Sequence, residues 1–167
     1  THLKLKNWRN FREVDVPLRE TTYLLGPNAS GKSNLLDVFR FLRDVSKPSG
    51  GGLQQAVAIR GGIAKLRCLH ARKDPEVRIE VHLSEQIDAS APLWRYVLGF
   101  KPDRKGVHNL HVSTEEVWHS SKRLFARPDD DDKGDSRRLT QTHLEQINVN
   151  AQFREIADFF GSVTYLH

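Results

Sequence analysis

This chain contains one segment that limits its possible folds more than any other, Gly26-Pro27-Asn28-Ala29-Ser30-Gly31-Lys32-Ser33. The segment matches the phosphate-binding loop pattern G-x-x-x-x-G-K-[ST] at every position. The pattern has structural meaning only with a strand before it and a helix after it. Residues 21–25 predict a buried strand that enters the loop, and residues 34–43 predict a helix that leaves it. The sequence therefore predicts an α/β fold that binds a nucleoside triphosphate.

Each residue type in this loop has a chemical role. Glycine at positions 26 and 31 lets backbone N–H groups approach phosphate oxygens that a Cβ would obstruct. The helix that follows points its positive N-terminal end at the same phosphates. We expect Lys32 to reach the β- and γ-phosphates and the Ser33 hydroxyl to ligate Mg²⁺. With ATP and Mg²⁺ as the predicted cofactors, the predicted binding residues are Gly26, Pro27, Asn28, Ala29, Ser30, Gly31, Lys32, Ser33 and Asn34.

Bulk properties exclude several classes of protein. The chain has 167 residues, enough for one sizeable core. Its single cysteine, Cys68, excludes an internal disulfide framework and favours the cytoplasm. No apolar run is long enough to span a bilayer, so we expect no membrane contact. Residues 1–72 hold 13 Lys/Arg against 5 Asp/Glu, but no dense basic stripe with interleaved aromatic residues marks a nucleic-acid surface.

The remaining segments predict mostly antiparallel structure. Alternating apolar residues before the loop predict a hairpin, with its turn at residues 7–10. Alternation resumes at Val77 and predicts a meander of strands at 77–83, 94–100, 109–113, 116–119 and 123–126. The helix after the loop is predicted to be buried over most of its circumference, through Leu35, Leu36, Val38, Phe39, Leu42 and Val45.

Three further patterns complete the predicted organisation. Residues 53–59 predict a short helix, and residues 129–132 predict an exposed acidic loop. Phe153, Ile156, Ala157 and Phe160 recur at helical spacing, with Asn150 as a candidate cap, and a strand is predicted to begin at Val163. We therefore expect one incomplete domain with three parts: a nucleotide-binding segment at 1–72, an antiparallel segment at 73–136, and a helix with the start of a further strand at 137–167. The Cys68–His70 and His108–His111 spacings do not favour a zinc site.

The N-terminal region resembles one group of phosphate-loop proteins. Lys6-Asn7-Trp8-Arg9-Asn10-Phe11-Arg12 is followed by a second strand and then by Leu25-Gly26-Pro27-Asn28-Ala29-Ser30-Gly31-Lys32-Ser33-Asn34-Leu35-Leu36-Asp37. Both segments are similar to the opening of the RecF/SMC/OLD group of ABC-type ATPases. Ala29 replaces a glycine of that pattern and Val38 an alanine. Arg60-Gly61-Gly62 and the antiparallel segment after it also resemble the predicted ATPases of the OLD/AAA-15/21 type. The resemblance is close over residues 1–45 and looser beyond them.

The resemblance implies the N-terminal lobe of an ABC-type head, with a mixed core sheet beside an antiparallel β-subdomain. It implies two such heads that sandwich ATP as a homodimer. It further implies a link to DNA repair, chromosome maintenance or defence against phage and plasmids, with DNA and an accessory or nuclease domain as possible partners. By matched position, it places Asn10, Phe11 and Arg12 near the base or sugar of the nucleotide.

Several motifs of the group do not occur in this sequence. No apolar run ends in Asp-Glu, no Leu-Ser-x-Gly-Gln signature is present, and Gln54, Gln55 and Gln86 lack the strand that precedes a Q-loop glutamine. We therefore expect the N-terminal portion of a longer ATPase that binds nucleotide but hydrolyses it poorly alone. Two alternatives stay open, a nucleotide-gated binding module and a small phosphate-loop kinase. The lack of an Asn-Lys-x-Asp motif counts against a GTPase.

Overall fold

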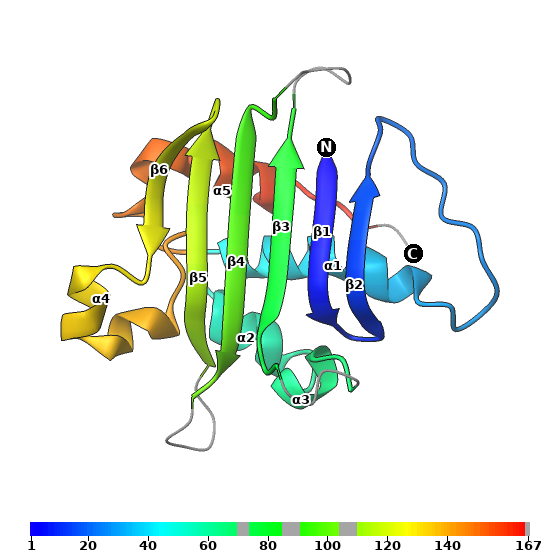
Figure 1. The fold of residues 1–167 in the computed structure, drawn as a ribbon, viewed down its shortest axis with the longest axis horizontal. Helices are drawn as coiled ribbons and strands as arrows, with labels where there is room; N and C mark the ends of the chain where they lie inside the picture. The colour runs from blue at the N-terminus through cyan, green and yellow to red at the C-terminus, as the bar shows by residue number, and fades with distance from the viewer. Residues whose placement is uncertain (70–73, 85–90, 104–109, 166–167) are drawn as a thin grey trace.

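The fold is built on one six-stranded sheet with the strand order β2-β1-β3-β4-β5-β6 (Figure 1). The computed structural model describes residues 1–69, 74–84, 91–103 and 110–165. All five strand pairings are antiparallel, so the described residues do not contain the mixed sheet that we predicted. The strands are β1 (His2–Trp8), β2 (Phe11–Pro17), β3 (Val77–Leu83), β4 (Trp94–Pro102), β5 (Leu110–His119) and β6 (Lys122–Arg127).

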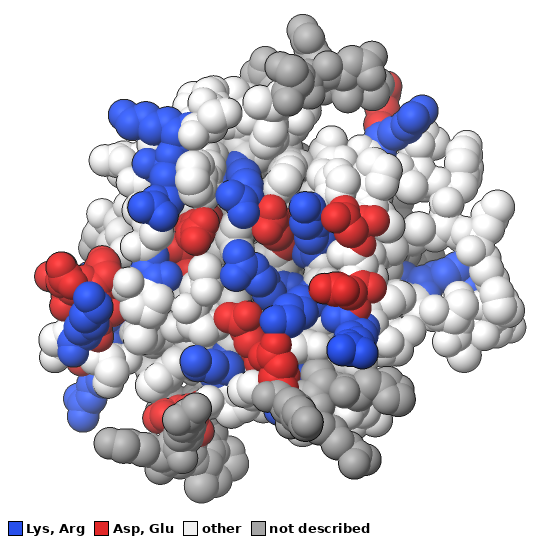
Figure 2. Space-filling model, viewed as in Figure 1, with Lys and Arg blue, Asp and Glu red and all other residues white. Residues whose placement is uncertain are grey.

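Alternation along the strands gives the sheet one apolar and one polar face. Leu3 and Leu5 of β1 are buried, as are Val77, Ile79 and Val81 of β3. The residues between them face the other way, and Figure 2 shows Lys, Arg, Asp and Glu interleaved over that open face. Because both charge signs alternate there, this face is not a surface of one sign that would attract a polyanion.

Helices cover only the apolar face (Figure 1). The longest is α1 (Lys32–Ser46), and the others there are α2 (Leu53–Ala58), α3 (Ile63–Leu66) and α5 (Arg154–Gly161). The predicted burial of α1 is partly wrong. Leu36 is exposed and Phe39 only half-buried, whereas Phe41 is fully buried between the rings of Trp8 and Phe100. The helix is therefore amphipathic, with a single apolar stripe against the sheet.

The predicted strand at residues 21–25 does not form. Strand β2 ends at Pro17, and residues 18–31 make a long loop beyond that edge of the sheet (Figure 1). A strand requires a neighbour for its backbone hydrogen bonds, and no described strand pairs with this segment. Tyr23 and Leu25 are therefore 82% and 92% exposed, although their sequence pattern is that of a buried strand.

The C-terminal third differs from its prediction in three places. The strands predicted at 109–113 and 116–119 are one continuous β5. The predicted acidic loop is the short helix α4 (Asp130–Gly134), in which Asp132 is buried. The 3-10 helices η1 (Ser136–Thr140) and η2 (Asn150–Phe153) follow, and the predicted helix at the end is confirmed as α5. Residues 163–165 are not a strand.

Candidate functional site

The loop at residues 26–33 runs directly into the first turn of α1. Gly31 has a φ of +102° and Ala29 a φ of +62°, so the chain turns through the left-handed region twice just before the helix begins at Lys32. Glycine takes this conformation freely, whereas alanine takes it at a cost. The Lys32 ammonium donates to the carbonyl oxygens of Gly26 and Pro27, at 2.7 and 2.8 Å. These two bonds hold the Lys32 ammonium against the backbone of the loop.

The hairpin turn between β1 and β2 packs against this loop. A Cβ added at Gly31 would lie 2.5 Å from Nδ2 of Asn10 and 2.8 Å from Cζ of Phe11. The Asn34 amide also donates to Oδ1 of Asn10 at 2.8 Å. The structure thus brings Asn10 and Phe11 together with the loop. Arg12, the next residue of β2, is exposed.

A cluster of four charged side chains lies behind the hairpin turn. Asp37 of α1 accepts from Nη2 of Arg9 at 2.6 Å and from Nε of Arg60 at 3.1 Å. Arg60 also pairs with Asp44, at 3.0 Å. Burial opposes ionisation of Asp37, but the hydrogen bonds from the two arginines prevail and hold the pKa of its carboxyl below the usual value. Sequence patterns did not identify this cluster, because Arg9 and Arg60 are distant from Asp37 in the chain.

A cavity of about 550 Å³ opens beside the hairpin turn and the start of α1. Its walls include Asn10 and Asn34, which also touch the loop, and the cationic side chains of Arg9, Lys65 and Arg67. Backbone bonds fix these walls, because residue 9 donates to Leu66 and Cys68 donates to residue 7. The volume is within the range of small-ligand sites, so the cavity adds room for a polar ligand next to the loop.

The residues present fit a triphosphate with its Mg²⁺. The first-turn N–H groups of α1 lie at a helix N-terminus where no acidic side chain opposes an anion. Ser33 is exposed in this turn, and its hydroxyl has no hydrogen-bond partner among the described residues. A Cβ at Gly31 would overlap the side chains of Asn10 and Phe11, which would have to move. A phosphate ligand could therefore reach the lysine, the helix N-terminus and a free hydroxyl together.

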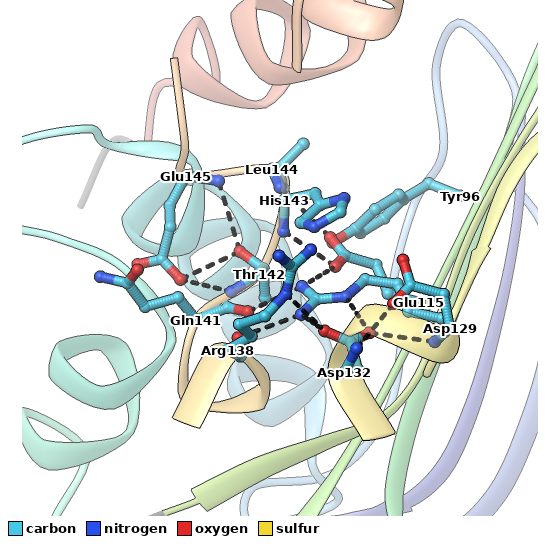
Figure 3. A network of polar contacts seen from close by, with 11 residues as sticks. Tyr96, Glu115, Asp129, Asp132, Arg138, Gln141, Thr142, His143, Leu144 and Glu145 are labelled. Carbon is cyan, nitrogen blue, oxygen red and sulfur yellow. Dashed lines mark hydrogen bonds and ion pairs between the residues drawn. The ribbon is translucent and has the colours of Figure 1, made fainter. Parts of the chain in front are cut away.

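A second polar network lies at the opposite edge of the sheet, near β5 and β6 (Figure 3). Glu115 is fully buried and accepts from the Tyr96 hydroxyl, from Arg127 and from the backbone N–H groups of His143 and Leu144. Arg127 also forks onto Asp132, at 2.7 and 3.0 Å. Glu115 and Asp132 both pair with Arg127, so each charged side chain has a partner of opposite charge. We therefore interpret this network as structural. Gln54 is likewise structural, since its amide bridges the backbones of Leu110 and Thr140.

No group of three His, Cys, Asp or Glu side chains could hold a metal ion in the described part of the chain. His70, His108 and Gln86 lie outside the described residues. Within those same residues, no helix is both long and apolar enough to cross a membrane.

Comparison with known proteins assigns the family. The model of an AAA domain described as "putative AbiEii toxin, Type IV TA system" matches residues 22–160, and that of a "P-loop containing region of AAA domain" matches residues 1–42. The chain belongs to this AAA domain family. The predicted resemblance to the RecF/SMC/OLD group is also confirmed.

Curated relatives agree with that assignment. The chain is 31% identical to the DNA replication and repair protein RecF of Roseiflexus castenholzii, over 67% of this chain and 31% of the relative. It is 48% identical to RecF of Chloroflexus aggregans over 28% of this chain and 12% of the relative. It is 28% identical to RecF of Agathobacter rectalis over 48% of this chain and 23% of the relative. The chain thus spans about a third or less of the length of these relatives. No solved structure matches it.

Proposed function

We propose that this chain binds MgATP as the nucleotide-binding part of an ABC-type head. The observation that carries the proposal is the loop itself, in which two left-handed residues bring the backbone to the N-terminus of α1 with Lys32 above it. In this proposal the loop N–H groups and Lys32 bind the phosphates, and Ser33 holds Mg²⁺. The cavity at Asn10 and Asn34 takes the rest of the nucleotide.

The process served is proposed from the relatives. All three relatives are named DNA replication and repair protein RecF, which favours a role in DNA repair over chromosome handling or defence. Pairing of two heads across ATP would supply a homodimer, and DNA would then be the larger partner. Addition of MgATP should shift the sedimentation coefficient of the chain toward that of a dimer if this pairing occurs.

One observation favours a second candidate, a nucleotide-gated binding module. Asp37 is the acidic residue of α1 nearest to the loop, but two arginines already hold its carboxylate. It is therefore not free to activate a water molecule. Within the described residues, the site is equipped to bind phosphate more clearly than to hydrolyse it.

The test is MgATP binding and turnover by the chain and by its Lys32→Ala variant. We expect the variant to lose at least tenfold in affinity, because it lacks the charge that meets the phosphates. We also expect both proteins to hydrolyse MgATP slowly. Equal affinity of the two proteins would overturn the proposal, and fast Lys32-dependent turnover would replace the gated module with a self-sufficient hydrolase.

A further inference from the structure

Two carboxylates on α1 enter the same ion-pair cluster but reach different neighbours. Asp37 contacts Arg9 of the hairpin turn and Arg60 at the end of α2. Asp44 lies two helical turns further on and contacts Arg60 at 3.0 Å. Its other ion-pair partners, Arg43 and Lys47, belong to the same end of α1. Of these two carboxylates, only Asp37 therefore contacts the hairpin turn.

Arg9 is the residue through which that link acts. Its φ of +50° lies in the left-handed region, so the turn requires outside contacts to hold it. The guanidinium is held by Asp37, and the backbone N–H donates to Leu66. With Arg9 fixed in this way, the next residues, Asn10 and Phe11, are placed against Gly31.

The cluster is poorly explained as a source of stability. The side chains of Asp37, Arg60 and Asp44 are 15%, 6% and 12% exposed, so all three have lost most of their hydration. The attraction within buried ion pairs often no more than offsets that desolvation, and apolar side chains of similar size often stabilise as well. Such a cluster instead fixes the orientation of its side chains, because a carboxylate held from two sides has only one orientation.

We propose that Asp37 is a positioning residue of the nucleotide site, which through Arg9 holds the hairpin turn against the phosphate-binding loop. The proposal rests on the proposed function, since it assumes that the loop binds MgATP. Loss of the link removes the side-chain restraint on Arg9, so the turn is held less firmly and Asn10 and Phe11 support Gly31 less well at its φ of +102°. Nucleotide affinity then falls even where the protein stays folded.

The test compares Asp37→Asn with Asp44→Asn in the full chain. Both variants keep the side-chain size, and both remove one charge that Arg60 contacts. We expect both to lower the melting temperature, but only Asp37→Asn to weaken MgATP binding, by about tenfold, at a temperature where both are folded. Asp37→Glu should restore part of the affinity. Amide hydrogen exchange at residues 9–11 should accelerate in Asp37→Asn alone.

Other outcomes separate the two proposals. Equal affinities of Asp37→Asn and Asp44→Asn, at whatever stability, would overturn the positioning role and leave the cluster merely structural. If Asp37→Asn does not fold, Arg9→Lys carries the same test, because it keeps the positive charge on the cavity wall but removes the double contact with Asp37. Failure of the unaltered chain to bind MgATP in a Lys32-dependent way would instead overturn the proposed function.

Discussion

At the scale of single residues, the loop shows how backbone conformation sets the choice of amino acid. Gly31 and Ala29 both have positive φ values, but their surroundings differ. Asn10 and Phe11 crowd Gly31, so its lack of a side chain serves both its dihedral angles and its packing. Ala29, which is exposed, bears only the conformational cost, about 1–2 kcal/mol for a left-handed alanine. Because this cost is small, alanine is tolerated at a loop position where the related ATPases have glycine.

Gly31→Ala should therefore be severe. The left-handed conformation would cost about 1–2 kcal/mol and the overlap with Asn10 about 1–3 kcal/mol. We expect the free energy of unfolding, measured with urea, to fall by about 2–4 kcal/mol, and MgATP binding to be lost. Gly161→Ala is the matched control, because a Cβ there meets nothing within 4 Å. A loss at Gly31 no larger than at Gly161 would show that the turn does not pack on the loop in solution.

At the scale of elements, the buried network joins β5 and β6 to α4 and the segment that follows η1. Burial is the largest influence on most of its members. It raises the pKa of Glu115 despite the backbone N–H groups and Arg127 that favour its charge. Burial, with the positive charge of Arg127 next, lowers the pKa of His143 to about 4. For Asp132 burial also acts to raise the pKa, but the hydrogen bonds and charge of Arg127, with the hydrogen bonds from the Asp129 backbone and from Arg138, together outweigh it and lower the pKa.

These shifts predict how stability depends on pH. The unfolded chain binds a proton at His143 near pH 6.5, whereas the folded chain does so only near pH 4, so stability falls as the pH drops through this window. Between pH 7 and pH 5, we expect the free energy of unfolding, measured with urea, to fall by about 1–2 kcal/mol more in the unaltered protein than in His143→Gln. Protonation of Asp132, whose pKa is lowered in the folded state, reduces stability only below about pH 4. Parallel pH profiles of the two proteins would contradict a neutral, half-buried His143 in the folded protein.

The same elements show which features a sequence can reveal. Alternation and turn residues predicted β1 to β4 closely, because each strand has one face on the core and one in water. Asp132 could not be identified as buried, since nothing in an acidic run indicates which carboxylate meets an arginine. The loop residues 26–34 were found as a local motif. The partners of Asp37 were not, because they depend on contacts between segments far apart in the chain.

At the scale of the whole molecule, the sheet is covered on one side only, and the loop before α1 leaves its edge (Figure 1). Tyr23 and Leu25 in this loop are 82% and 92% exposed, whereas Leu24 between them is packed on the core. The sequence pattern alone would make all three apolar side chains part of a buried strand. The structure instead predicts that only Leu24 contributes to the stability of the isolated chain.

Serine substitutions distinguish these two descriptions. Exposed positions without special contacts change stability by less than about 0.5 kcal/mol, so Tyr23→Ser and Leu25→Ser should leave the free energy of unfolding almost unchanged. Leu24→Ser should cost about 1–3 kcal/mol, because it removes apolar area from the core and brings a hydroxyl to it. Urea unfolding of the three variants at one pH measures the contrast. A loss above about 1 kcal/mol at Tyr23 or Leu25 would mean that this segment is covered in solution, as a strand paired with a neighbour would be.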